Sequence, residues 1–120
     1  MGKVVVNLTA GAEDSERATI AFLVGTAAQS AGHEVLAFFT MEAVRLAFPD
    51  GPQTVAVQEG RPAFTELWEQ FVAAGGVVYL CPFCVTSREL GDEPLPGATV
   101  AGATPMWAWI GESPATVFSY

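Results

Sequence analysis

The chain has 120 residues, of which 51% are hydrophobic and only 15% are charged. Its 13 acidic residues outnumber its five basic ones, so the formal net charge is −8. This acidity, with basic residues scattered rather than clustered, argues against nucleic acid and anionic membranes as partners. No stretch reaches the roughly 18 uninterrupted apolar residues of a membrane span. We expect residues 1–120 to form a single domain with its own core.

Strand-like and helix-like patterns alternate along the chain. Apolar β-branched runs predict strands, whereas apolar residues at every third or fourth position predict helices with one buried face. In the first half we expect a strand over residues 3–8, a helix capped by Asp14 or Ser15 and ended by Gly32, a strand over 33–39 and a short helix over 41–47. The prolines and glycine of residues 48–52 then predict a loop.

In the second half, Pro62 begins a predicted helix that Gly75-Gly76 ends. There follow a predicted strand over 77–80, a short helix to about residue 90, a polar loop, a strand over 98–101, a Trp-rich turn or helix over 105–110 and a strand over 115–119. The strands are continuously apolar, which is typical of a parallel sheet covered on both faces. We therefore predict a three-layer α/β/α fold with a mainly parallel five-stranded sheet.

The only two cysteines lie in Cys81-Pro82-Phe83-Cys84, directly after the predicted strand 77–80. Pro82 suits the first position of a helix, which places Cys81 at the helix cap. The free amides of a helix start stabilise a thiolate more than a thiol. Cys84 is three residues further on, within disulfide reach of Cys81. We expect Cys81 to be an exposed nucleophile and Cys84 its resolving partner or a buried spectator, although both could be inert packed thiols.

Zinc binding is the main rival interpretation of two cysteines at this spacing. Structural zinc takes four ligands, usually cysteine or histidine, and the only histidine is His33. His33 begins a predicted strand, so it should lie at the opposite end of the sheet from Cys81. We therefore expect neither a metal site nor a bound cofactor.

Open parallel sheets bind their ligands beyond the carboxyl ends of the strands. The loop after the first strand could offer amides and hydroxyls to an anion there, although an ordinary turn is the favoured interpretation. Arg88 could stabilise a thiolate, but we expect it to face solvent. Trp107 and Trp109 could belong to the core or to a self-association surface. The candidate residues that line the crevice are Thr9, Gly11, Met41, Pro82 and Trp107.

The chain is more apolar than a small monomer can hide, so we expect copies of it to associate. Its first residues lead straight into a strand and lack the layout of a signal peptide. We therefore expect it in the reducing cytoplasm. In that compartment a CxxC sequence is more often catalytic or metal-bound than a structural disulfide.

The chain combines three features: a strand over Lys3–Leu8 with a helix opening at Asp14, a Gly75-Gly76 pair before an apolar strand, and a cysteine at that strand's end. In these features, and in length and element order, the chain resembles the DsrE/DsrF-like sulfur-relay family. The resemblance implies a flavodoxin-like fold and assembly as a homotrimer or homohexamer. It also implies that Cys81 matches the cysteine on which some members carry sulfane sulfur as a persulfide. Cys84 departs from their single-cysteine pattern.

We therefore predict a small sulfur-handling protein that accepts sulfane sulfur on Cys81 and passes it on. Its partners would be sulfur donor and acceptor proteins or small persulfides. One alternative is a dithiol–disulfide oxidoreductase that uses both cysteines. Another is a non-catalytic oligomer that binds a small ligand or a partner, so whether the chain is an enzyme stays open. A thioredoxin fold, which Thr104-Pro105 also suggests, is not expected, because two strand–helix units and a third helix precede the cysteines.

Overall fold

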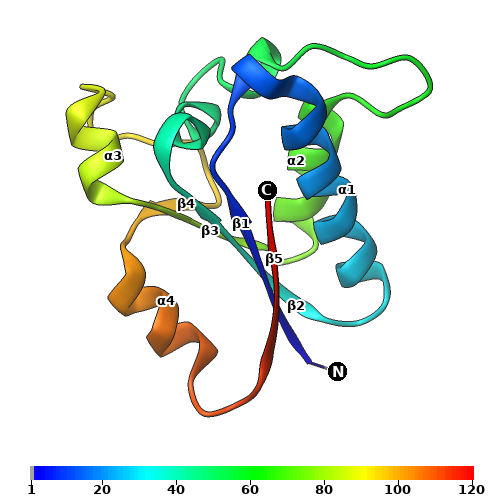
Figure 1. Ribbon diagram of the computed structural model, residues 1–120, viewed down its shortest axis with the longest axis vertical. Helices are drawn as coiled ribbons and strands as arrows, with labels where there is room; N and C mark the ends of the chain where they lie inside the picture. The colour runs from blue at the N-terminus through cyan, green and yellow to red at the C-terminus, as the bar shows by residue number, and fades with distance from the viewer. Residues whose placement is uncertain (1) are drawn as a thin grey trace.

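The computed structural model describes residues 2–120 (Figure 1). In chain order, its strands, helices and 3₁₀ helices (η) are β1 (Lys3–Leu8), η1 (Ala12–Asp14), α1 (Ser15–Ser30), β2 (Glu34–Phe39), η2 (Met41–Ala47), η3 (Pro52–Thr54), α2 (Phe64–Ala73), β3 (Val77–Leu80), α3 (Pro82–Ser87), β4 (Ala98–Val100), α4 (Ala103–Ile110) and β5 (Ala115–Ser119). The order of strands and helices is the predicted one.

Local differences from the predicted elements follow from backbone chemistry. Helix α4 begins at Ala103 rather than at Pro105, because a proline in the first turn of a helix sacrifices no hydrogen bond. Pro62 lies before α2 rather than within it. Residues 41–47 form a 3₁₀ helix, whose first residue has a positive φ.

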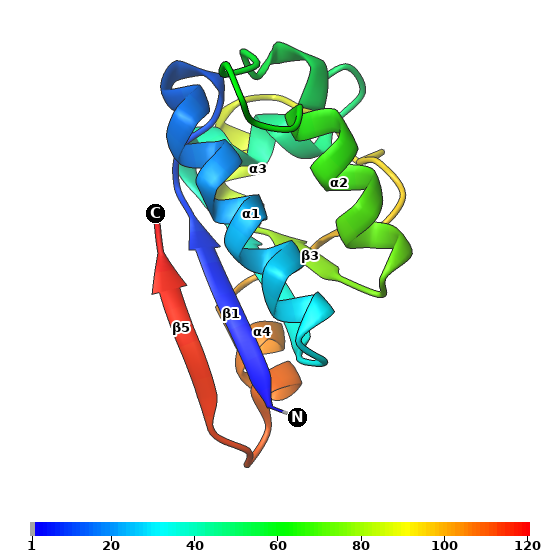
Figure 2. The same cartoon turned by 90° about the vertical axis from the view of Figure 1, so that its right-hand side faces the viewer.

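The five strands form one sheet in the order β4-β3-β2-β1-β5, and every neighbouring pair is parallel. The chain steps in one direction from β1 to β4 and then returns across the sheet to the free edge of β1. Because parallel crossovers are right-handed, this reversal places α4 on the opposite face of the sheet from α1 and α2 (Figures 1 and 2). The predicted α/β fold with a parallel five-stranded sheet is confirmed.

Helices α1 and α2 end in the same kind of turn. Gly32 follows α1 and Gly75 follows α2, one residue beyond each C-cap, with φ values of 93° and 87°. In each turn, the N–H of the glycine and that of the next residue donate to carbonyls of the last helical turn at 2.9–3.0 Å. Glycine adopts this left-handed conformation without steric cost, so the turn leads the chain directly into the next strand.

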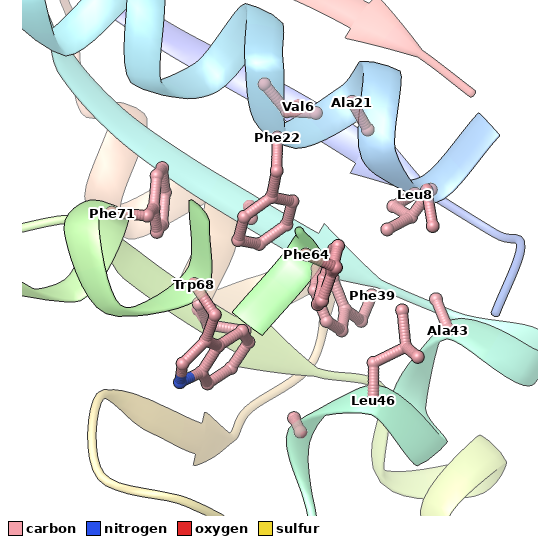
Figure 3. Packing of buried hydrophobic residues seen from close by; sticks show 14 of the residues in the cluster. Val6, Leu8, Ala21, Phe22, Phe39, Ala43, Leu46, Phe64, Trp68 and Phe71 are labelled. Carbon is pink, nitrogen blue, oxygen red and sulfur yellow. The ribbon is translucent and has the colours of Figure 1, made fainter. Parts of the chain in front are cut away.

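An aromatic cluster forms the centre of the larger core, between the sheet and helices α1 and α2 (Figure 3). Phe22 of α1 lies with its ring centroid 4.8 Å from that of Phe64 and 5.0 Å from that of Phe71, both on α2. Phe39 of β2 meets Phe22 edge-on at 5.8 Å. All four side chains are almost completely buried. Aromatic pairs in such geometries gain about 0.5–1.5 kcal/mol beyond the burial of their area.

The other face of the sheet is covered less fully. Its smaller core consists of Val5, Leu36 and Ile110, with Phe38, Tyr79 and Trp109 among the side chains packed against it. The covering helix α4 has only eight residues. No helix in residues 2–120 has the length and apolar character that a membrane crossing requires.

Candidate functional site

Cys81 lies at the junction that the sequence predicts, between the last residue of β3 and the first residue of α3. Its N–H donates to the carbonyl of Phe39 at the end of β2, at 3.0 Å, and its own carbonyl accepts from Val85 at 3.1 Å. Both cysteines are free thiols and partly buried. Cys81 is therefore less exposed than its cap position suggested.

A backbone amide from the neighbouring segment contacts the second cysteine. The N–H of Met41 donates to Sγ of Cys84 at 3.1 Å. Met41 has a φ of 56°, a left-handed conformation that is uncommon for a residue with a side chain. Strained conformations of this kind cluster at functional sites. The predicted crevice residue Met41 thus contributes its main chain, while its side chain is 56% exposed.

The surroundings of Cys84 act on its thiol in opposite directions. Burial raises the pKa of Cys84, whereas the hydrogen bond from Met41 lowers it. The hydrogen bond and the charge of Cys81 raise the pKa again, and the nearby Arg88 lowers it. The net direction is upward, so Cys84 holds its proton more tightly than an ordinary thiol. Cys81 caps α3 and Cys84 is the third residue of that helix, so the two side chains lie on the same side of its first turn.

An ion pair joins α3 to η2 beside the cysteines. Nε of Arg88 donates to the carboxylate of Glu42 at 2.6 Å, and Nη1 of Arg88 donates to the Cys84 carbonyl at 3.3 Å. The Arg88 side chain is only 23% exposed, so our expectation that it faces solvent is wrong. Arg88 lowers the pKa of Glu42 more than any other neighbour does. Glu42 is not among the predicted site residues, because 46 positions separate it from Arg88 and no local pattern links them.

The predicted crevice residues are divided between the site and other parts of the molecule. Met41 and Pro82 adjoin the cysteines. Thr9 instead donates its hydroxyl to the carbonyl of Tyr120 at 3.0 Å, and the N–H of Gly11 donates to a carboxylate oxygen of Glu13 at 2.7 Å. The polar groups of this loop therefore serve the chain itself, as an ordinary turn would.

The two tryptophans of α4 differ in environment. Trp109 packs against the sheet, and Nζ of Lys3 lies 5.1 Å from the centroid of its ring. The same ammonium donates to the Trp109 carbonyl at 2.5 Å. Trp107 is 65% exposed, on the side of the sheet opposite α1 and α2. Trp109 therefore belongs to the core, whereas Trp107 is free for other contacts.

Solvent and apolar surface adjoin the cysteine pair. Phe83, between the two cysteines, is 85% exposed. A cavity of about 440 Å³ lies along α3 on the side of β4, with Pro82, Val85 and Val100 in its lining. Neither cysteine is among the residues that line this cavity, but Pro82, which does line it, directly follows Cys81. The arrangement suits exchange between sulfur atoms.

The described residues offer little to a metal ion. No group of three or more His, Cys, Asp or Glu side chains gathers within residues 2–120. His33 lies just before β2 and accepts a hydrogen bond from the N–H of Gly2 at 3.0 Å. Cys81 follows the carboxyl end of β3, so the two lie at opposite ends of the parallel sheet, as predicted.

Comparisons with known proteins agree with this architecture. The chain is similar in structure to the YchN protein of E. coli, with a TM-score of 0.79, 15% sequence identity and coverage of 100% of both chains. At this identity the likeness concerns the fold. No curated protein sequence matches the chain. The model of the DsrE/DsrF-like family matches residues 2–118, almost the whole length. This chain therefore belongs to the DsrE/DsrF-like family.

Proposed function

We propose that the protein accepts sulfane sulfur on Cys81 and passes it to an acceptor. Membership of the DsrE/DsrF-like family supports a role in sulfur relay at the level of the family. The observation that carries the proposal is a free, partly exposed thiol at the strand–helix junction, with a second thiol beside it. Cysteine reactivity of this kind needs access and a thiolate, and both cysteines lie where a partner can approach.

The proposed cycle has two sulfur transfers. The Cys81 thiolate attacks the outer sulfur of a donor persulfide, R–S–SH, which forms Cys81–S–SH and releases RS⁻. An acceptor thiolate then attacks the outer sulfur on Cys81, takes it as a new persulfide and leaves the Cys81 thiolate. Neither transfer consumes an oxidant or a reductant. The donor and acceptor are proteins or small persulfides in the cytoplasm.

The apolar surface around the cysteines supports protein partners. Phe83 is 85% exposed and Met41 is 56% exposed, and each lies next to a cysteine in sequence or in space. Exposed large apolar side chains around a reactive group suit the docking of a partner segment that carries its own cysteine. A small persulfide would not need them.

A second candidate function is dithiol–disulfide exchange. The specific observation in its favour is the placement of both cysteines at the start of α3, together with the hydrogen bond from the Met41 N–H to Cys84. In this case both cysteines cycle between dithiol and disulfide, and a disulfide substrate replaces the persulfide. The two functions differ in their need for Cys84.

We also propose that the chain acts as a homotrimer or homohexamer. Three large apolar side chains, Trp107, Val117 and Phe118, are between 41% and 65% exposed on α4 and β5. Strand β5 is at the sheet edge, with β1 as its one neighbour among the described strands. A second copy of the chain that covers this region would bury both the side chains and the unpaired strand edge.

A transfer assay separates these functions. The protein is loaded with glutathione persulfide, freed from the donor and mixed with a small thiol acceptor, whose persulfide is then measured. We expect transfer by Cys84→Ser and none by Cys81→Ser. If Cys81→Ser transfers as much sulfur as Cys84→Ser does, persulfide carriage on Cys81 is wrong. If the unmodified chain reduces a disulfide substrate, and Cys84→Ser neither reduces it nor transfers sulfur, dithiol exchange is correct.

A further inference from the structure

The spacing of the two cysteines has a consequence for a persulfide on Cys81. The inner sulfur of that persulfide is Sγ of Cys81 itself, and Cys84 is three residues further on, on the same side of the first turn of α3. A thiolate that attacks the inner sulfur of a persulfide expels the outer sulfur as HS⁻. The chain therefore carries an internal route to sulfide beside the route to an external acceptor.

The Met41 amide favours the ionised form of Cys84. Its N–H donates to Sγ of Cys84 at 3.1 Å, and a hydrogen bond to a thiolate is stronger than one to a thiol. This donor comes from η2, not from the helix that holds the cysteines. Met41 adopts a left-handed backbone conformation where it donates to Cys84. Its side chain is mostly exposed and does not explain that conformation.

The Glu42–Arg88 pair holds this donor in place. Glu42 directly follows Met41, and its carboxylate accepts from Nε of Arg88 at 2.6 Å. Arg88 also donates to the carbonyl of Cys84 at 3.3 Å. The pair thus connects Glu42, which follows the donor Met41, to Cys84, which accepts the hydrogen bond from Met41. Loss of either charge would loosen α3 from η2 and would remove support for a Cys84 thiolate.

We propose that Cys84 resolves the persulfide on Cys81 with release of sulfide, and that Glu42 and Arg88 are positioning residues for this step. The proposal rests on the proposed function, because it starts from sulfane sulfur on Cys81. Cys84 first loses its proton to water. The step is then Cys81–S–SH + Cys84–S⁻ → Cys81–S–S–Cys84 + HS⁻. The bond between the inner and outer sulfur breaks, both cysteines are oxidised to the disulfide, and the sulfane sulfur is reduced to sulfide.

A single-turnover experiment follows the step directly. One equivalent of glutathione persulfide is added to the reduced protein, and intact mass and free sulfide are measured over time. The unmodified chain should gain about 32 Da and then convert to a form about 2 Da lighter than the reduced protein. Sulfide should appear at the rate of that conversion. Cys84→Ser should keep the added sulfur and release no sulfide. Sulfide release by this variant at the unmodified rate, or an unmodified chain that keeps the added mass of about 32 Da, overturns the proposal.

The positioning role is tested with substitutions at both ends of the ion pair. Glu42→Gln and Arg88→Gln should gain sulfur at the unmodified rate but convert several-fold more slowly, because the Met41 donor is then held less firmly against Cys84. Arg88→Lys should recover part of the rate. Arg45→Gln is the matched control, because Arg45 pairs with the same carboxylate at 2.9 Å but, within residues 2–120, forms no hydrogen bond or ion pair with α3. It should convert like the unmodified chain.

The pH profile distinguishes thiolate support from a merely structural effect. The charged and titratable groups around Cys84 are Cys81 and Arg88 at the two caps of α3, and Glu42 with its second partner Arg45 on η2. Conversion should speed up as the pH rises and Cys84 ionises. In Arg88→Gln this rise should shift to higher pH. Conversion rates and pH profiles in Glu42→Gln and Arg88→Gln that equal those of the unmodified chain would overturn the positioning role.

A parallel reaction separates failure of this inference from failure of the proposed function. Oxidised glutathione forms a mixed disulfide on Cys81, which Cys84 can resolve with release of glutathione thiolate. If no variant takes up sulfur from the persulfide, the proposed function and the release of sulfide are both wrong. The rate at which Cys84 resolves the mixed disulfide then still tests the positioning role of Glu42 and Arg88. Slower resolution in Glu42→Gln and Arg88→Gln supports that role, and equal rates contradict it.

Discussion

Single residues of η2 and at the end of α3 form the surroundings of the cysteine pair. Met41 turns its amide to Cys84 through a left-handed backbone, and Arg88 reaches across to Glu42. None of these contacts could be predicted from the sequence. Methionine has no preference for positive φ, and the ion pair joins residues that are far apart in the chain. The cap position of Cys81, in contrast, followed from Pro82 and the apolar strand before it.

We expect the left-handed backbone of Met41 to affect the stability of variants at this position. Glycine adopts a φ of 56° without strain, whereas alanine keeps the strain and removes only the exposed side chain. We expect Met41→Gly to be more stable than Met41→Ala by about 1 kcal/mol. Urea denaturation of the two variants measures the difference. Equal stabilities would mean that the left-handed conformation is not maintained in solution.

We expect the contribution of Glu42 to the stability of the folded chain to depend on pH. Its ion pair with Arg88 lowers the pKa of its carboxyl, so the folded state favours the ionised form. This contribution is fully present above the ordinary carboxyl pKa, and it is lost as the pH falls through the lower pKa of the folded state. The stability gap between the unmodified chain and Glu42→Gln should therefore shrink on acidification. Because the side chain is 40% exposed, the gap at neutral pH should not exceed about 1 kcal/mol.

Denaturation across this pH range provides the test. The matched control is Glu66→Gln, because Glu66 is exposed on α2 and forms no ion pair among residues 2–120. A gap for Glu42→Gln that stays constant or widens in acid would contradict the assigned ion pair.

At the scale of elements, the turn between α2 and β3 places Cys81 because it sets where the strand begins. Gly75 has a φ of 87° and open space around it. Gly76 lies against Phe71: a Cβ added there would be 2.6 Å from the Phe71 carbonyl oxygen and would also overlap its ring. The two neighbouring glycines are thus needed for different reasons, one conformational and one steric.

Alanine substitutions separate these two reasons. Gly76→Ala must displace the buried Phe71, which costs about 2–3 kcal/mol as other overpacked cores do. Gly75→Ala meets no atom and costs only the left-handed conformation, about 1 kcal/mol. Chemical denaturation of both variants gives the order. A smaller loss for Gly76→Ala than for Gly75→Ala would contradict the packing described for this turn.

Elements were predictable where local chemistry specifies them. The glycines after α1 and α2, the Asp14 cap, whose side chain accepts from the N–H of Arg17, and the apolar strands all left a signal in the sequence. The 3₁₀ form of residues 41–47 left none, because its geometry depends on Met41 and on packing against α3. Sequence patterns also could not show that Thr9 and Gly11 bond within their own chain.

At the scale of the whole molecule, the two faces of the sheet differ. The face under α1 and α2 holds the aromatic core, whereas α4 alone packs on the other. The sequence predicted two covered faces and an excess of apolar residues, but not their distribution. That excess lies partly on α4 and β5, where Trp107 and Val117 are exposed. Such a surface is consistent with the homo-oligomer that we propose.

A substitution of Trp107 tests whether the chain forms this oligomer. We expect the unmodified chain to have the mass of an oligomer by size exclusion with light scattering, and Trp107→Ser to shift it toward monomer by loss of a large aromatic contact. Val57→Ser is the control, because Val57 is 66% exposed in the loop before α2. It should leave the oligomer intact. A monomeric unmodified chain, or equal behaviour of the two variants, would contradict the assembly.

The central claim is that Cys81 carries sulfur, and intact mass after incubation with glutathione persulfide tests it most directly. Cys84→Ser removes the internal route to sulfide, so any sulfur on Cys81 should remain there. We predict a gain of about 32 Da in Cys84→Ser and none in Cys81→Ser, with the added sulfur on the peptide that contains Cys81. No gain in Cys84→Ser, or an equal gain in Cys81→Ser, would contradict the account.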